Sequence, residues 1–224
     1  MRRRSWREMA VRIVLLLLGL SIAHLGVTLF LQSDLGSDPF NVFVQGLFRS
    51  FPWPEFFAMT HGRTHLLISL LILLILFFVD RSYIGVGTVL CMALGGPIID
   101  VFTVLLAPVV HGGLPLPIRI VLLAAGCAVL AFGMTIVIRS QAGTGPNDLV
   151  AVVLSDKSHK PFGPVRIGVD LCFTLAGFAL GGVVGLGTVI CAFLVGPTAQ
   201  LCFPVSQRIC ETLLKQFAGV RSQS

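Results

Sequence analysis

Two acidic residues, Asp100 and Asp170, lie within long apolar runs. A charged side chain at the centre of a bilayer costs about 2.5–3.5 kcal/mol even on insertion-based scales, so such residues usually bind an ion or substrate or pair with another charge. Arg166 stands four residues before Asp170, a spacing that places both side chains on one face of a helix. We therefore expect an Arg166–Asp170 ion pair and, for Asp100, contact with a substrate or coupling ion.

Gly-Pro interruptions occur in two of the apolar runs. The first, GGP at residues 95–97, precedes Asp100, and the second, GP at residues 196–197, precedes Gln200 by the same spacing. A proline inside a helix frees backbone carbonyls, which need polar partners at membrane depth. Matched interruptions in two halves of a chain indicate a transporter binding site, and a kink that only improves packing is the alternative.

Two glycine-containing loops lead into prolines. They read SDLGSDPFN at residues 33–41 and SQAGTGPND at residues 140–148. Proline is favoured in the first turn of a helix, so each loop predicts a helix start whose free N–H groups can bind an anion or a polar ligand. The alternative is ordinary capping, by Asp38 in the first loop and by Asn147 and Asp148 in the first turn of the second helix.

These loops and interruptions supply the candidate substrate-binding residues. They are Asp34, Gly36, Asp38, Pro39, Asn41, Gly96, Pro97, Asp100, Gly143, Gly145, Pro146, Asn147, Asp148, Gly196, Pro197 and Gln200. His24 is more typical of a hydrogen-bonded histidine within a bundle than of a proton relay, and His61 with His65 supplies two metal ligands where a site needs more. We expect no metal, no cofactor and no catalytic residues, since GxSxG and HExxH motifs are absent.

The composition indicates which elements must hold these residues. Hydrophobic residues make up 55% of the 224-residue chain and charged residues only 12%, which leaves too little polar surface for a water-soluble domain. Continuous apolar runs of about 20 residues favour spanning helices over the alternating strands of a β-barrel. We therefore expect an all-α membrane protein whose main partner is the lipid bilayer.

Six apolar runs are long enough to cross the membrane. They are residues 13–31, 64–79, 84–106, 118–138, 167–184 and 186–205. The two proline-led stretches, residues 39–51 and 146–154, are too short to span. They predict short helices that dip into the membrane or lie at its edge, one after the first span of each half.

The basic residues indicate the orientation of the chain. The formal net charge of +6 comes from short stretches between the apolar runs and at both ends, which argues against a nucleic-acid surface. If the N-terminus is cytoplasmic, only Arg49, Arg63 and Arg119 of the 16 Lys and Arg residues lie outside. The positive-inside rule therefore predicts that both termini of this multi-pass protein are cytoplasmic.

The chain contains an internal repeat. At an offset of 107, RIVLL at residues 12–16 recurs at residues 119–123 and the two proline loops align, and GVGTVLC at residues 85–91 matches GLGTVIC at residues 185–191. Three crossings per repeat is an odd number, so the second copy must enter the membrane from the opposite side. We predict two inverted three-helix repeats, residues 1–112 and 113–207, followed by a cytoplasmic tail, residues 208–224.

The segments LQSDLGSDPFNVFVQGL and GVGTVLCMALGGPIID, with their echoes RSQAGTGPNDLV and GLGTVICAFLVGPTAQ, resemble the YczE/YyaS/YitT group of bacterial integral membrane proteins, most closely its YczE-type members. The resemblance covers nearly the whole chain. Phe40-Asn41 stands where an aromatic-Asp pair commonly follows the proline in that group. The resemblance implies a plasma-membrane location and no particular activity.

Inverted repeats with polar breaks near the middle of the membrane are typical of secondary transporters. We therefore expect a permease for a small solute or ion. The alternatives are a non-catalytic partner that assembles other membrane components and, less favoured, an intramembrane enzyme; the fold alone does not decide among them. The charge of the solute and self-association into a homo-oligomer are left open.

Overall fold

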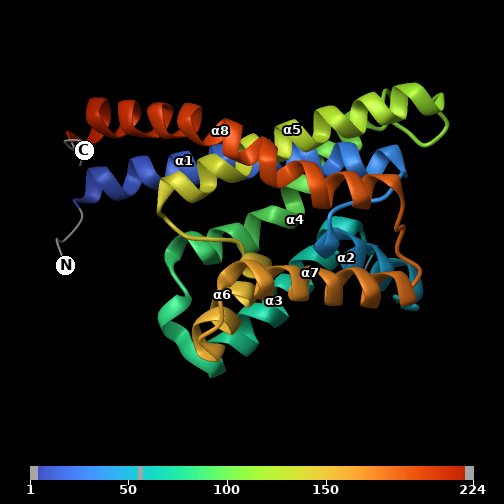
Figure 1. The fold of residues 1–224 in the computed structure, drawn as a ribbon, viewed down its shortest axis with the longest axis horizontal. Coiled ribbons are helices and arrows are strands. Elements are labelled where there is room, and N and C mark those ends of the chain that lie inside the picture. Colours follow the sequence, from blue (N-terminus) through green and yellow to red (C-terminus); the bar gives the residue numbers. More distant parts are fainter. Residues whose placement is uncertain (1–4, 55–57, 220–224) are drawn as a thin grey trace.

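The computed structural model describes residues 5–54 and 58–219, and every regular element among them is a helix (Figure 1). The elements are α1 (Trp6–Ser33), α2 (Pro39–Ser50), α3 (His61–Asp80), the 3-10 helix η2 (Arg81–Tyr83), α4 (Val86–Leu106), α5 (Leu116–Ser140), α6 (Pro146–Ser158), α7 (Phe162–Ala179) and α8 (Leu186–Ala218). The predicted all-α class is confirmed.

Six of these helices are long and apolar enough to cross a membrane, namely α1, α3, α4, α5, α7 and α8. They correspond to the six predicted spans. The two proline-led helices are also present, since α2 begins at Pro39 and α6 at Pro146. The Asp38 side chain accepts a hydrogen bond from the backbone N–H of Asn41, so the predicted capping of α2 is confirmed.

Two helix ends differ from the prediction. Helix α7 ends at Ala179 rather than near residue 184, because the chain turns at Gly181, whose φ is +81°. Helix α8 continues past residue 205 to Ala218, with Pro197 and Pro204 inside it. Its added turns are amphipathic rather than apolar, and they bury Cys210 and Leu214 with residues of α1 and α5, which a search for apolar runs does not detect.

Helices α1 and α5 make the most extensive helix–helix contact, and they run antiparallel. Glycines face each other at two points along the crossing. A Cβ built on Gly26 would lie 2.6 Å from the Gly126 carbonyl oxygen, and one built on Gly133 would lie 2.7 Å from that of Gly19. No side chain larger than hydrogen fits at these points, and small residues are what allow membrane helices to approach so closely.

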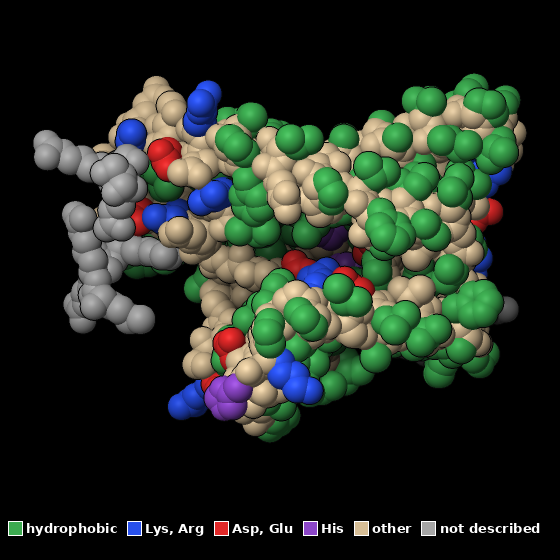
Figure 2. All heavy atoms as spheres, in the orientation of Figure 1, with side chains coloured by type: hydrophobic (Ala, Val, Ile, Leu, Met, Phe, Trp, Pro, Cys, Tyr) green, Lys and Arg blue, Asp and Glu red, His purple; other side chains and the backbone are tan. Residues whose placement is uncertain are grey.

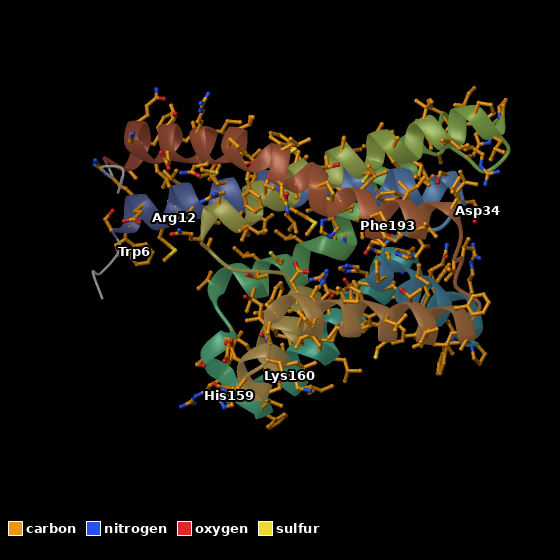
Figure 3. All side chains as sticks on the ribbon, in the orientation of Figure 1. Trp6, Arg12, Asp34, His159, Lys160 and Phe193 are labelled. Carbon is orange, nitrogen blue, oxygen red and sulfur yellow. The ribbon has the colours of Figure 1, made fainter. Side chains whose placement is uncertain are left out.

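Arginines hold both ends of this crossing. Arg12, near the start of α1, donates from Nη1 to the Ser140 carbonyl oxygen at the end of α5 (2.9 Å). Arg119, near the start of α5, donates from Nε to the Ser33 carbonyl oxygen at the end of α1 (2.6 Å). Figure 3 shows Arg12 and Asp34 at opposite ends of α1. Each guanidinium thus satisfies a terminal carbonyl that lacks a partner within its own helix.

The helices form two layers joined by α4 (Figure 1). We call α1, α5 and α8 the α1 layer, and α2, α3, α6 and α7 the α2 layer; α4 packs on both α1 and α3. The connections between layers also touch each other. Gly187 at the start of α8 donates from its backbone N–H to the Leu35 carbonyl oxygen (2.7 Å), and Gly87 at the start of α4 lies against Ala142 and Gly143. Both proline loops are therefore fixed against the start of a spanning helix.

The α1–α5 contact predicts a steric effect that can be measured. Gly133→Ala should destabilise the protein by roughly the 1–3 kcal/mol typical of overpacking, because its Cβ would lie 2.2 Å from the backbone nitrogen of Ala23. Gly168→Ala on α7 is the matched control, since nothing lies within 4 Å of its Cβ position. Thermal unfolding in detergent tests this; equal midpoints for the two variants would contradict the close contact.

Candidate functional site

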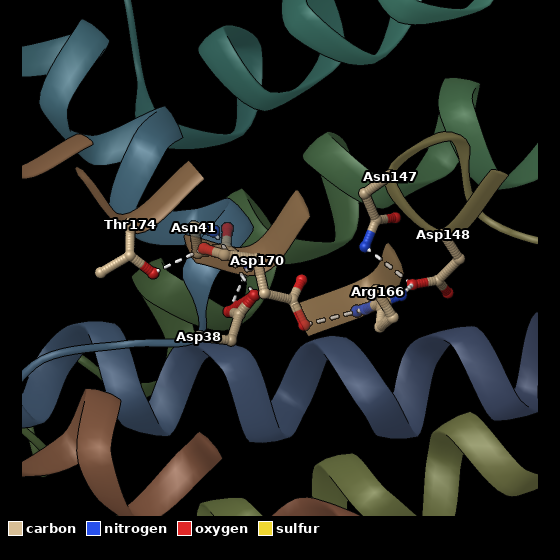
Figure 4. Close-up of polar contacts among 7 residues, drawn as sticks. All are labelled: Asp38, Asn41, Asn147, Asp148, Arg166, Asp170 and Thr174. Carbon is tan, nitrogen blue, oxygen red and sulfur yellow. Dashed lines mark hydrogen bonds and ion pairs between the residues drawn. The ribbon is translucent and has the colours of Figure 1, made fainter. Parts of the chain in front are cut away.

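Charged side chains gather in a hollow between the two layers. Figure 2 shows acidic and basic side chains there, on a face that is otherwise largely apolar. The close-up in Figure 4 draws the residues that we call the polar cluster, which are Asp38, Asn41, Asp148, Arg166 and Asp170. They come from the start of α2, the start of α6 and the first half of α7. The site therefore combines residues from both halves of the sequence.

Arg166 is the centre of the polar cluster. Its Nη1 forms an ion pair with Asp148 Oδ1, and its Nε forms another with Asp170 Oδ2 at 2.9 Å. The predicted Arg166–Asp170 pair is thus confirmed, and Asp148 is an additional partner that the spacing within α7 did not indicate. The three side chains are 27–30% exposed. One guanidinium therefore pairs with two carboxylates, and the partly exposed group keeps an excess negative charge within reach of a solute.

Asp38 is a third carboxylate in the same place. Its Oδ2 accepts hydrogen bonds from Asn41 Nδ2 (2.7 Å) and Ser37 Oγ (3.2 Å), and it lies close to Asp170 in Figure 4. Burial raises the pKa of the Asp38 carboxyl above its ordinary value, the hydrogen bonds from Asn41 and Ser37 oppose this, and the negative charge of Asp170 adds to it. No ion pair joins Asp38 to a cation among the described residues, and its carboxyl holds a proton more readily than that of an exposed aspartate.

Behind the polar cluster lies a group of histidines. His61 Nε2 donates to Asn41 Oδ1 (3.0 Å), and the ring of His65 meets the rings of His24 and Phe40 edge-on, with centroids 5.7 Å and 5.2 Å apart. His24 is hydrogen-bonded to its own helix, as expected, through Nδ1 to the Leu20 carbonyl oxygen (2.8 Å). The pairing of His24 with His65 joins two spans, and no spacing in the sequence predicted it.

His65 and Ser69 are buried, and each has a polar side-chain atom that forms no hydrogen bond to the described residues. His65 Nδ1 and Ser69 Oγ have no hydrogen-bond partner within residues 5–54 and 58–219. At the offset of 101 that aligns α3 with α7, His65 corresponds to Arg166 and Ser69 to Asp170. This correspondence is a sequence signal for both residues, and His65 was also marked by its spacing from His61. Within the same described ranges, no group of three or more His, Cys, Asp or Glu side chains is placed to hold a metal ion.

Asp100 lies outside the polar cluster and holds the start of α3. Its Oδ2 accepts from Thr60 Oγ1 (2.6 Å) and its Oδ1 accepts from the backbone N–H of Gly62 (2.9 Å). These bonds account for the carboxylate in an apolar run, because they satisfy two donors at a helix N-terminus. A contact of Asp100 with solute or ion stays a prediction.

The other candidates fall into three places. At the start of α6, Asn147 Nδ2 donates to Asp148 Oδ1 (3.2 Å), next to Gly145 and Pro146. In the connections, Gly36 and Gly143 pack against the starts of α8 and α4, and Asp34 is exposed and 3.7 Å from Arg49 Nη2. Away from the polar cluster are the residues of the two interruptions: Gly96 packs on Gly62, Pro97 lines an open apolar groove, and Gly196, Pro197 and Gln200 are exposed.

The Arg166 pairs predict a stability effect with a rescue. Arg166→Met should destabilise the protein by about 1–3 kcal/mol, less than the 3–5 kcal/mol of a fully buried pair because the side chains are partly exposed. Adding Asp148→Asn and Asp170→Asn should restore most of this, since no unpaired charge is then left. Lys157→Met is the control. It removes the ion pair between Lys157, whose side chain is 52% exposed, and Asp80 (2.8 Å), and it should lower the free energy of unfolding by less than about 1 kcal/mol. Failure of the triple variant to recover in thermal unfolding would contradict the pairing.

Asp38 predicts a pH dependence of stability. Its folded-state pKa is raised, so its contribution is complete below the ordinary value of about 3.9 and is lost as the pH rises through the higher folded-state value. The melting temperature of the wild type should therefore fall more between about pH 4 and 7 than that of Asp38→Asn, which keeps a capping side chain but cannot titrate. Parallel curves for the two proteins would show that Asp38 is not perturbed.

Comparisons with known proteins agree with a multi-pass membrane protein. The chain is 27% identical over 202 residues to the uncharacterized membrane protein YczE of Bacillus subtilis (89% of both chains), and 23% identical over 194 residues to YyaS of the same organism (85% of this chain, 92% of YyaS). It is also 29% identical over 204 residues to an uncharacterized protein of Haemophilus influenzae (91% of this chain, 88% of the relative). No solved structure matches. The resemblance to YczE and YyaS is thus confirmed.

A family model also matches the chain. Residues 10–204 match the model of DUF6198, a family of unknown function, and the chain therefore belongs to that family.

Proposed function

We propose that the protein is a permease for a small solute or ion in the plasma membrane, built from two inverted three-helix repeats. The observation that carries the proposal is the polar cluster. The first turn of α6 and the N-cap of α2 belong to different halves, yet Asp148 pairs with Arg166 of α7 and Asp38 faces Asp170 of the same helix. Polar groups gathered from both halves at the start of short helices are what a transporter needs for a shared binding site.

The reciprocal contacts of α1 and α5 support the inverted repeat. The offset of 107 pairs Arg12 with Arg119 and Ser33 with Ser140, and each arginine donates to the serine carbonyl of the other helix. The glycine contacts follow the same rule. At this offset Gly19 corresponds to Gly126 and Gly26 to Gly133, so the Gly19–Gly133 contact corresponds to the Gly126–Gly26 contact. Contacts that exchange partners in this way are those expected of a two-fold axis between the halves.

The charges of the polar cluster favour a cation or an amine as the solute. The polar cluster contains three carboxylates, Asp38, Asp148 and Asp170, and one guanidinium, that of Arg166, which pairs with the last two. The helix starts that attract anions are already occupied, since Asp38 caps α2 and Asp148 lies in the first turn of α6. The polar cluster is therefore better suited to a cation than to an anion.

Transport is tested with the full chain in proteoliposomes. Uptake of radiolabelled sodium, rubidium, methylammonium and phosphate is compared with uptake into liposomes without protein. At least one of the three cations should enter faster, and phosphate should not. Asp38→Asn should reduce that uptake at least about tenfold, because it removes one carboxylate of the polar cluster while keeping the cap. Asp156→Asn, at an exposed position of α6, is the matched control and should keep the wild-type rate.

The same preparation separates transport from the assembly role. If no probe enters above the protein-free rate while a membrane component co-purifies in stoichiometric amount in mild detergent, the permease proposal is wrong and a partner function replaces it. If phosphate alone enters, the permease stands and the cation assignment is wrong.

A further inference from the structure

The two halves contain matching glycine pairs in their second and third spans. Gly62 is the second residue of α3 and Gly163 the second residue of α7, and the offset that aligns Ser69 with Asp170 aligns these two as well. Gly96 in α4 corresponds to Gly196 in α8. If the halves were packed identically, Gly163 would meet Gly196 as Gly62 meets Gly96.

The first pair is in direct contact. A Cβ built on Gly62 would lie 2.2 Å from the Gly96 carbonyl oxygen, and one built on Gly96 would lie 2.1 Å from that of Gly62. Asp100, one turn further along α4, holds the same helix start through Thr60 and Gly62. The start of α3 is therefore fixed to the middle of α4.

The second pair is apart. Nothing lies within 4 Å of a Cβ built on Gly163 or on Gly196, and both residues are exposed, as is Gln200 at the position that corresponds to Asp100. Across the described part of the chain, α7 and α8 have no extensive contact, whereas α3 and α4 do. The α1 layer and the α2 layer are thus joined on the α3–α4 side and separated on the α7–α8 side, where the hollow of Figure 2 lies.

The α2 layer has the connectivity of a body that moves as one. Its four helices pack on each other, with Gly46 of α2 against the Gly177 carbonyl oxygen of α7 (2.5 Å from a built Cβ). Helix α4 links the layers, since it packs on α3 of the α2 layer and on α1 of the α1 layer. Further links are the His24–His65 ring contact between α1 and α3 and the two crossings of connections, at Gly36 with Gly187 and at Gly143 with Gly87. These crossings can serve as pivots.

We infer that the α2 layer rocks against the α1 layer, so that the Gly163–Gly196 contact forms while the Gly62–Gly96 contact opens. In the second arrangement the Gln200 side-chain oxygen can accept a hydrogen bond from the backbone N–H of Gly163. Asp100 accepts the corresponding bond from Gly62 in the present structure. The motion closes the hollow over the polar cluster on one side and opens it on the other. This inference rests on the proposed permease, for which it supplies the two access states.

Disulfide trapping tests the inferred contact in the full chain in proteoliposomes. The double variant Gly163→Cys with Gly196→Cys is made with Cys172→Ser and Cys202→Ser, because these two native thiols are not fully buried. A disulfide requires Cα atoms about 4.4–6.8 Å apart, so mild oxidation should link the pair only if α7 reaches α8. Gly168→Cys with Gly196→Cys is the matched control, because residue 168 is also unobstructed but lies five residues, about 140°, around the helix. Free thiols are counted by mass after maleimide labelling.

We expect most of the 163/196 protein and little of the 168/196 protein to lose both introduced thiols. Equal reaction of the two, in proteins that elute like the wild type, would overturn the inference. As a second variant, Gly163→Trp should leave the melting temperature unchanged and lower uptake of the transported cation at least about tenfold, while Gly168→Trp keeps it. Retained uptake in Gly163→Trp would also overturn the inference.

Uptake of the sodium, rubidium, methylammonium and phosphate panel by the same proteoliposomes separates the two proposals. Uptake that stops on oxidation and returns on reduction supports both. A specific 163/196 disulfide in a protein that moves no probe before oxidation would leave the rocking motion and remove the permease. Normal uptake without a specific 163/196 disulfide would leave the permease and remove the rocking motion.

Discussion

The contact between α1 and α5 is the constraint on which the other elements depend. Lipid tails are as apolar as leucine side chains, so spanning helices gain little from burying apolar surface and must associate through close packing and polar contacts. Glycines at two points within the crossing let the two backbones touch, and Arg12 and Arg119 hold the helix ends through carbonyl groups. Because the helices are antiparallel and held at this register, the two proline loops emerge at opposite ends of the pair.

The position of these loops determines where α2 and α6 begin. Each loop is held against the start of a spanning helix of the other half, Leu35 and Gly36 by α8 and Ala142 and Gly143 by α4. The short helices then extend into the α2 layer, where Asp38 and Asp148 meet α7. The polar cluster is thus a consequence of the α1–α5 register, and its cost in an apolar surrounding is offset by the Arg166 ion pairs and by the cap that Asp38 forms.

Elements defined by local sequence were predictable, and contacts between distant elements were not. Apolar run length identified the six spans, and Pro39 and Pro146 identified the starts of α2 and α6, because both signals act within a few residues. The Arg166–Asp170 pair was predictable for the same reason, since its spacing lies within one helix. The partners of Asp100, at Thr60 and Gly62, come from a different helix and could not be found by spacing.

The two similar stretches of sequence pack differently. Gly62 and Gly96 correspond in sequence to Gly163 and Gly196, yet the first pair touches and the second is apart. Their residue types therefore permit the contact without requiring it, and the relative position of the layers decides whether it forms. Asp100 binds two donors at the start of α3, whereas the corresponding Gln200 is exposed. A neutral amide loses less than a carboxylate when it is left without protein partners, since only the charge carries a large desolvation cost. The acid therefore stands where α3 and α4 are in contact, and the amide stands where α7 and α8 are apart.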